Sequence, residues 1–167
     1  MQKIKYFLLV AVFGAIVFTS CNNQAETIST TEVSWLSMSD VESKMDKKKK
    51  KVVVDIYTAW CGPCKMMDRT TFADEDVIKT LNSDFYPVKF NAEGPDVISF
   101  KGKDYSNPSY DPAKAKRRNS KHQLAPFFNV RGYPSVVVLD EDFNIVEKLT
   151  GYKKPNQLLD ALAKHNS

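Results

Sequence analysis

The chain has 167 residues, which suits a single domain of ordinary size, and its 43% hydrophobic and 26% charged residues exclude an intrinsically disordered protein. The formal net charge of +4 is too small to favour nucleic acid as a partner. Three cysteines are too few for a disulfide-stabilised scaffold, and two histidines argue against a histidine-rich metal site.

Residues 1–20 are predicted to be a lipoprotein signal peptide. Two lysines precede an apolar run at 6–18, which as a helix would measure about 20 Å and not span the ~30 Å core of a membrane. The small residues before Cys21 resemble a bacterial lipobox, so we expect lipid on the Cys21 thiol. An ordinary cleaved signal peptide and an uncleaved anchor are the alternatives. Asn22 favours the outer membrane, by the sorting preference of enteric bacteria.

Residues 21–32 are polar and are predicted to form a flexible tether, followed by one domain at 33–167. In chain order we predict a strand at 33–36, a helix at 40–50 capped by Ser39 and Glu42, a strand at 52–57, helices at 61–68 and 74–81, a strand at 85–91, a short helix before Ser135, strands at 135–140 and 144–149, and a helix at 155–164. This order indicates an α/β sandwich around a central mixed sheet.

Residues 92–124 interrupt this order as a long insertion that is rich in proline, glycine, serine and asparagine. Insertions of this length inside a compact domain are usually functional or disordered. We expect Asp111 and Pro112 to begin a short helix that runs through a basic cluster, and aromatic side chains to hold the insertion to the domain. The basic residues are Lys114, Lys116, Arg117, Arg118 and Lys121, and the aromatic residues are Phe100, Tyr105 and Tyr110.

The segment 59–65, AWCGPCK, directly follows a predicted strand and begins a predicted helix. Two cysteines three residues apart on the first turn of a helix place both sulfur atoms on one side, within reach of a disulfide bond. Cys61 lies at the helix N-terminus, where unpaired N–H groups and the helix dipole lower the pKa of its thiol. Cys64, one turn further in, is placed to resolve a mixed disulfide. Half of a zinc site is the alternative, but the chain has no second cysteine pair to complete it.

Residues 60–65, WCGPCK, are identical to the active-site sequence of thioredoxins, and residues 33–164, apart from the insertion, resemble the thioredoxin superfamily. The resemblance implies a thioredoxin-like α/β fold, a three-layer sandwich whose central mixed sheet is flanked by helices, with the long insertion before a cis-proline. Residues 66–72 and 76–88 are similar to a periplasmic branch related to the C-terminal domain of the transmembrane thiol:disulfide interchange protein. The insertion and Tyr133 depart from the family pattern, which leaves the substrate open but not the chemistry.

The resemblance also implies roles for individual residues. Asp55 matches the family's buried acid, and we expect it to accept the proton of the Cys64 thiol or to be paired. Lys89 matches the lysine that neighbours this acid. Residues 125–134 match the segment that leads to the family's cis-proline, so the Tyr133–Pro134 bond is expected to be cis. The residues expected to bind substrate are Trp60, Gly62, Pro63, Tyr133, Pro134 and Gly151.

Together these motifs predict a membrane-tethered thiol–disulfide oxidoreductase of the bacterial cell envelope, lipid-anchored and facing the periplasm. Gly62 and Pro63 stand where oxidases and isomerases of the superfamily commonly have a histidine. This difference favours a reductant with a reduction potential of about −270 mV. Such a reductant would reduce disulfide-containing client proteins with electrons from an inner-membrane donor.

We expect a monomer that needs no cofactor and no metal and binds no nucleic acid. Two other functions remain open. One is a disulfide oxidase or isomerase, for which the envelope is the expected compartment. The other is a tethered binding module with a thioredoxin fold, whose cysteine pair only supports an interaction made through the insertion. A mere binding module would not depend on the thiol of Cys61.

Overall fold

A computed structural model describes residues 30–166 of the chain. The predicted signal peptide, the lipidation site Cys21 and most of the predicted tether lie outside these residues. Within residues 30–166, the helices are all too short or too polar to cross a membrane.

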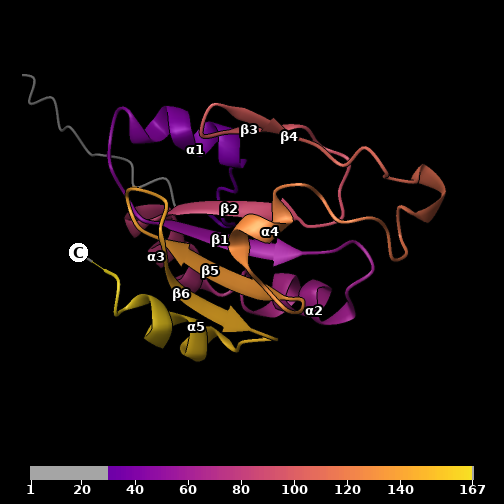
Figure 1. The fold of residues 1–167 in the computed structure, drawn as a ribbon. Helices are drawn as coiled ribbons and strands as arrows, with labels where there is room; N and C mark the ends of the chain where they lie inside the picture. Colours follow the sequence, from indigo (N-terminus) through magenta and orange to yellow (C-terminus); the bar gives the residue numbers. More distant parts are fainter. Residues whose placement is uncertain (1–29, 167) are drawn as a thin grey trace, which may run out of the picture.

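The centre of the fold is a four-stranded mixed sheet with the strand order β2-β1-β5-β6 (Figure 1). The strands are β1 (Val52–Tyr57), β2 (Tyr86–Asn91), β5 (Ser135–Leu139) and β6 (Ile145–Thr150). β1 and β2 are parallel, whereas β5 is antiparallel to both of its neighbours. β1 and β5 are rich in β-branched residues and almost wholly buried, because helices cover both faces of the central strands.

Two helical layers cover the sheet. One apolar cluster joins α1 (Met38–Met45) and α4 (Ala125–Phe128) to the sheet face that includes Val54 and Ile56. The other joins α2 (Gly62–Thr70), α3 (Glu75–Asp84) and α5 (Pro155–Leu162) to the face that includes Val53. Figure 1 shows α1 and α5 on opposite sides of the sheet. The predicted three-layer thioredoxin-like fold is thus confirmed.

The cap of α1 differs from the prediction. Ser37 and Asp40, rather than Ser39 and Glu42, form the capping box, in which each side chain accepts a hydrogen bond from the other's backbone N–H. Ser39 already lies inside the helix, and its hydroxyl donates to the carbonyl oxygen of Ser99 at 2.9 Å. The helix also ends at Met45 instead of residue 50. The predicted capping residues therefore fasten the insertion, because the Glu42 carboxylate accepts a bond from a backbone N–H there.

The predicted strand at 33–36 is reduced to an isolated bridge between Leu36 and Val88. Leu36 accepts from and donates to the backbone of β2, but Ser37 immediately begins the cap of α1, so no further pairing is possible. The other strands lie within one residue of their predicted bounds. α2 and α3 continue to Thr70 and Asp84, past their predicted ends at 68 and 81.

The insertion, residues 92–124, is ordered around a hairpin of β3 (Ile98–Phe100) and β4 (Lys103–Tyr105). The predicted helix at Asp111 is a single 3-10 turn, η1 (Pro112–Lys114), which ends at the first residue of the basic cluster. Phe100 is buried, and its ring centroid lies 5.2 Å from that of Phe127. Tyr105 contacts the same apolar cluster, and Tyr110 is half-buried in a turn. Aromatic contacts therefore hold the hairpin to the sheet, as predicted for Phe100 and Tyr105.

Candidate active site

The end of β1 positions the two cysteines. After Tyr57 the chain makes a short turn, and Cys61 becomes the N-cap residue of α2, with an extended backbone. Its sulfur accepts a hydrogen bond from the N–H of Cys64 at 3.2 Å. Pro63 occupies the first helical turn, where its missing N–H costs no hydrogen bond. The sequence thus begins the helix at Cys61, where a sulfur atom faces the unpaired N–H groups of the first turn.

Cys61 and Cys64 form a disulfide bond, and their Cα atoms are 5.3 Å apart. Both cysteines are buried, with 2% and 3% of their surface exposed, whereas Gly62 and Pro63 between them are exposed. The predicted pairing of the two sulfur atoms is confirmed. The exposed Gly–Pro link marks the side from which another polypeptide can approach the bond.

A buried carboxyl lies in the strand that leads to the cysteines. Asp55 is 2% exposed and points to the sheet face that α2 covers, since Val54 and Ile56 point to the other face. Lys89 is its register partner in β2, and the Lys89 Nζ lies 3.5 Å from the Asp55 Oδ2. Burial raises the pKa of Asp55 to about 7, although the charge of Lys89 acts in the opposite direction. The expected neighbourhood of acid and lysine is confirmed.

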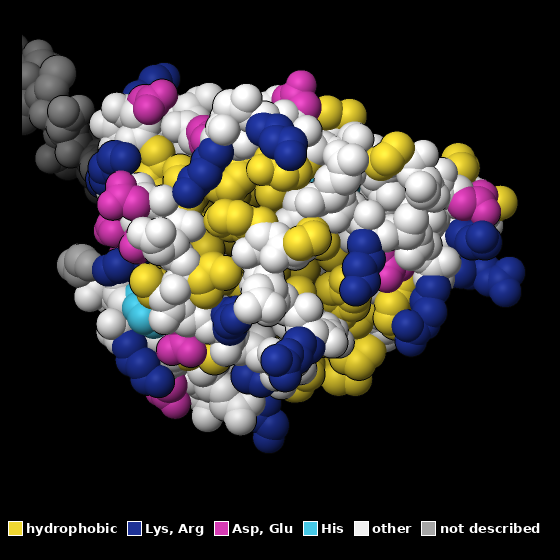
Figure 2. Space-filling model, viewed as in Figure 1, with side chains coloured by type: hydrophobic (Ala, Val, Ile, Leu, Met, Phe, Trp, Pro, Cys, Tyr) yellow, Lys and Arg dark blue, Asp and Glu magenta, His cyan; other side chains and the backbone are white. Residues whose placement is uncertain are grey.

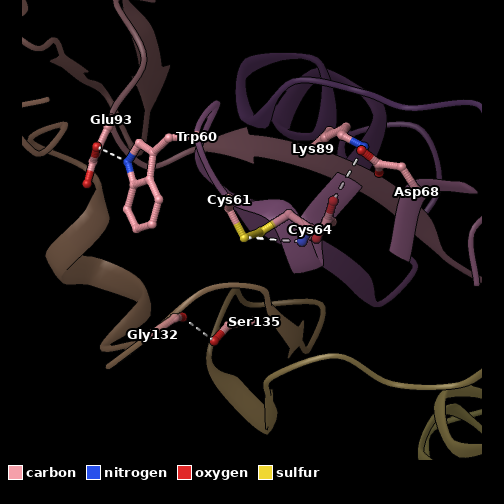
Figure 3. The surroundings of a disulfide bond; sticks show 9 residues. Trp60, Cys61, Cys64, Asp68, Lys89, Glu93, Gly132 and Ser135 are labelled. Atoms are coloured by element: carbon pink, nitrogen blue, oxygen red, sulfur yellow. Dashed lines mark hydrogen bonds and ion pairs between the residues drawn. A yellow bond between two sulfur atoms is a disulfide. The ribbon is translucent and has the colours of Figure 1, made fainter. Parts of the chain in front are cut away.

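A second carboxylate, Asp68 on α2, also pairs with Lys89 (Figure 3). Its negative charge raises the pKa of Asp55 further. Lys89 is therefore shared between two acids, which weakens its hold on the Asp55 carboxylate. Our sequence reasoning missed Asp68. The spacing could have found it, because Asp68 follows Cys64 by four residues and so lies on the same face of α2.

Aromatic rings surround the ammonium group of Lys89. Its Nζ lies 5.0 Å from the ring centroid of Trp35, 5.3 Å from that of Tyr57 and 5.8 Å from that of Phe72. Such rings attract a cation through their negative faces, so they compensate for part of its lost hydration. Trp35 and Phe72 also contact each other edge to face at 4.9 Å. These aromatic residues hold a partly buried charge in place beside Asp55.

Two side chains of the insertion, Glu93 and Arg118, contact Trp60. Its indole Nε1 donates to the Glu93 carboxylate at 2.7 Å (Figure 3). Its ring lies edge-on to that of Tyr133, with centroids 6.3 Å apart, and the guanidinium carbon of Arg118 lies 4.4 Å from its centroid. Glu93 was also missed from sequence, because no local pattern links a residue in a loop to a tryptophan 33 positions earlier.

The Tyr133–Pro134 bond is cis, as predicted. The surrounding turn is closed by the Ser135 hydroxyl, which donates to the Gly132 carbonyl oxygen at 2.8 Å, and Figure 3 shows this turn facing the disulfide. The Pro134 carbonyl oxygen accepts from the N–H of Gly151 at 2.8 Å. Gly151 has a φ of +79°, a backbone conformation that favours glycine. The structure thus brings the predicted substrate-binding residues 133, 134 and 151 together.

Comparison with known proteins identifies the family of this chain. Residues 38–166 match the family of thioredoxin-like domains. The thiol:disulfide interchange protein DsbD of Colwellia psychrerythraea is 28% identical over 158 residues, which cover 87% of this chain and 22% of that protein. DsbD of Haemophilus ducreyi is 25% identical over 170 residues, which cover 95% of this chain and 26% of that protein. The chain therefore spans about a quarter of the length of these relatives.

Solved structures agree on the fold. A thioredoxin from Thermus thermophilus superimposes with a TM-score of 0.57 at 18% identity, over 80% of this chain and 86% of the other. The DsbH oxidoreductase gives 0.56 at 13% identity, over 85% and 90%. The match of residues 38–166, the fold and the disulfide at the start of α2 lead to one conclusion: the chain belongs to the thioredoxin-like domain family of the thioredoxin superfamily.

Proposed function

We propose that the protein is a thiol–disulfide oxidoreductase that reduces disulfide bonds in proteins of the bacterial cell envelope. The observation that carries the proposal is the Cys61–Cys64 disulfide at the N-terminus of α2, beside an exposed Gly–Pro link. DsbD relatives are named for thiol:disulfide interchange, which supports the same reaction class and an envelope location. Because those proteins are several times longer, their substrates and partners do not transfer automatically.

The reaction runs in two exchanges. In the reduced protein, the Cys61 thiolate attacks one sulfur of a client disulfide, forms a mixed disulfide and releases the other client sulfur as a thiolate. The Cys64 thiolate then attacks the Cys61 sulfur, forms the disulfide seen in the structure and releases the second client thiolate. Two electrons pass from the cysteine pair to the client. Two electrons from a donor dithiol restore the reduced protein, and we propose an inner-membrane protein as that donor.

Asp55 is proposed to accept the proton of the Cys64 thiol before the second exchange. A proton acceptor works best when its pKa lies near the working pH, and burial raises the pKa of Asp55 to about 7. Lys89 and Asp68 would adjust that pKa from opposite directions. Lys89 thus stabilises the carboxylate form, and Asp68 limits this effect.

The client is proposed to bind as an extended strand beside the cis-proline. The backbone of Tyr133 would pair with it, while the residues around the disulfide contact its side chains. These residues are Trp60, Gly62, Pro63, Pro134 and Gly151. Their support comes from position, since the turn 132–135 faces the disulfide and Trp60 contacts Tyr133.

The direction of electron flow is proposed from the Gly62–Pro63 pair, which adds no donor or charge to the Cys61 thiolate. The reduction potential of the cysteine pair should therefore be about −270 mV, as in thioredoxin, and not about −120 mV, as in a strong oxidase. We also propose lipid on Cys21, outer-membrane attachment and a monomeric state. Replacing Cys21 by Ala should release or mis-process the protein, and finding the wild type wholly in the soluble periplasmic fraction would contradict the anchor.

Two measurements test the proposal. The full-length protein should reduce insulin with dithiothreitol as the electron source, and Cys61→Ser should abolish this activity. If the wild type and Cys61→Ser both reduce insulin no faster than dithiothreitol alone, the oxidoreductase is wrong and the tethered binding module remains. Redox titration against glutathione or dithiothreitol then gives the direction, since a potential more positive than about −200 mV would place the protein with isomerases and oxidases.

A further inference from the structure

The insertion contains a positively charged loop that contacts Trp60, the residue before Cys61. Its basic residues are Lys114, Lys116, Arg117, Arg118 and Lys121, all exposed. Figure 2 shows Lys and Arg side chains gathered at the right of the molecule, over the segment that protrudes there in Figure 1. Asp111 neutralises Lys114 at 3.1 Å, and within residues 30–166 no salt bridge engages the other four. The loop 114–121 therefore presents four cations without a carboxylate partner.

Reciprocal hydrogen bonds keep this basic loop in a defined shape. The backbone N–H of Asp111 donates to the Asn119 side-chain oxygen at 3.0 Å, and the Asn119 amide donates back to the Asp111 carbonyl oxygen at 2.9 Å. Buried Asn107 donates to the Ser120 carbonyl oxygen at 2.8 Å and accepts from its hydroxyl at 2.7 Å. Side chains of the insertion itself thus fix both ends of the loop. Because the loop is already ordered, it loses less conformational entropy when a client binds to it.

One carboxylate joins this loop to the candidate active site. Glu93 accepts from the Asn119 N–H at 2.8 Å and from the Trp60 indole at 2.7 Å with the same oxygen. The guanidinium of Arg118 lies over the Trp60 ring, and Trp60 immediately precedes Cys61. A cation of the insertion is therefore held on the side chain that directly precedes Cys61 in the sequence, and the same ring also contacts Tyr133.

We propose that the insertion is a recognition element that selects client disulfides flanked by acidic residues. A client strand that pairs beside Tyr133 must pass Trp60, where the loop 114–121 adds positive charge along its path. Carboxylates in that strand can form charge-assisted hydrogen bonds with Arg117 and Arg118. Attraction between opposite charges also raises the rate of encounter. This inference rests on the proposed function, because it names the substrate class of the same site.

The test compares two synthetic peptides that share one disulfide and differ in its flanks, glutamate in one and glutamine in the other. Reduction by the full-length protein, purified in detergent and pre-reduced, is followed by stopped flow. The wild type should reduce the acidic peptide about tenfold faster at low ionic strength, a gain at the lower end of electrostatic steering. This preference should largely vanish near 1 M salt, where the Debye length is about 3 Å.

The variant K116Q/R117Q should remove most of this preference, because it should lower the rate with the acidic peptide far more than the rate with the glutamine peptide. Its matched control is K47Q/K48Q, which neutralises two adjacent exposed lysines before the start of β1, whereas Cys61 follows its end. Arg118→Lys separates charge from stacking on Trp60, and it should keep most of the preference. An equal loss with both peptides, or equal effects of the two double variants, would overturn the proposal.

A second measurement keeps this inference distinct from the proposed reaction. Binding of a cysteine-free acidic peptide to Cys61→Ser is followed by fluorescence anisotropy, and K116Q/R117Q should weaken it about tenfold. If the wild type reduces neither peptide yet binds the acidic one through the loop, the oxidoreductase fails and the recognition surface stands. If the same loop binds vesicles of anionic lipid and not the acidic peptide, the surface serves the membrane and our inference is wrong.

Discussion

The cysteine pair and the insertion, residues 92–124, are ordered by different forces. The cysteines follow β1, whose valine and isoleucine side chains are fully buried, and they begin α2, which contacts the sheet through buried Met67. Between Phe100 and Leu124 the insertion has no buried apolar residue, and polar side chains that bond the backbone hold this segment instead. Buried His122, for example, accepts from the Leu124 N–H and bonds the Asp96 carbonyl oxygen at 2.8 Å.

This difference separates two tasks within one molecule. The geometry of the reacting sulfur atoms depends on the sheet and on α2, which any change in the core would disturb. The loop 114–121 depends on a few polar contacts, and Glu93 connects it to the candidate active site by bonding Trp60. Changes in the sheet region should therefore alter the reaction with every disulfide, whereas changes in the insertion should alter which disulfides react.

The largest effect should come from Cys64→Ser. With pre-reduced Cys64→Ser and no small-molecule thiol present, the reaction with any client should stop at the mixed disulfide, because the protein has no second thiolate to attack it. Clients should instead accumulate as adducts with Cys61. Non-reducing gels and mass spectrometry identify these adducts, and Cys61→Ser is the control that should trap none. Normal turnover in Cys64→Ser would break the assignment of the two cysteines.

Asp55→Asn should slow the second exchange by about a hundredfold at pH 7, the lower range for a lost proton acceptor. Asn preserves the shape of the side chain but cannot take up the Cys64 proton. The deficit should shrink above about pH 8.5, where an ordinary thiol ionises unaided. Stopped-flow measurement of mixed-disulfide resolution tests this, and an unchanged rate at pH 7 would remove Asp55 from the mechanism.

Asp55 should also make the stability of the oxidised protein depend on pH. Burial raises its pKa from 3.8 to about 7 in the folded state, so the folded protein keeps a proton that the unfolded chain loses between these values. This contribution is complete below about pH 4 and is lost as the pH rises through 7. Asp55→Asn should therefore increase the free energy of unfolding by about 2 to 4 kcal/mol at pH 8 and change it little at pH 4. Urea unfolding at both pH values measures the difference, and equal effects would contradict it.

Asn107→Ala should loosen the insertion and leave α2 intact. The variant loses the bonds of Asn107 to the Gly94 and Ser120 carbonyl oxygens, at about 1 to 2 kcal/mol for local opening. Amide hydrogen exchange in residues 107–121 should rise roughly tenfold or more. Asn156→Ala, at an exposed position of α5, is the matched control. A comparable rise in α2 would show that the two regions are not independent.

The smallest effect should come from Glu93→Gln, at the junction of the two regions. Gln still offers an oxygen to Trp60 and Asn119 but lacks the charge, so the bonds should weaken by about 1 kcal/mol. The indole N–H resonance of Trp60 should shift and exchange faster with solvent in NMR spectra. Glu32→Gln, which is exposed and distant in sequence, should leave it unchanged. An unchanged Trp60 resonance in Glu93→Gln would sever the proposed link between insertion and site.

Local patterns in the sequence determined most of the elements and the position of the chemistry. A β-branched run predicts a buried strand, and a cysteine pair at the start of the next helix predicts the nucleophile, because these signals lie within a few neighbouring residues. Resemblance to the family supplied the Asp55–Lys89 pair and the cis-proline. Both are present in the structure, with the Lys89 Nζ 3.5 Å from Asp55 and the Tyr133–Pro134 bond cis.

Only the tertiary structure decided where long side chains from distant segments meet. Asp68 shares Lys89 because α2 packs on the sheet face from which Lys89 projects, and Glu93 reaches Trp60 because the insertion returns to the end of β1. The partners of Ser39 and Glu42 were also decided there, because both side chains bond the insertion, whereas Ser37 and Asp40 cap α1 by bonding each other. Helical spacing puts Asp68 on the same face of α2 as Cys64, but no local pattern shows which distant side chains lie within its reach or within reach of Glu93. A hydrogen bond between residues far apart requires only that the fold bring two side chains together.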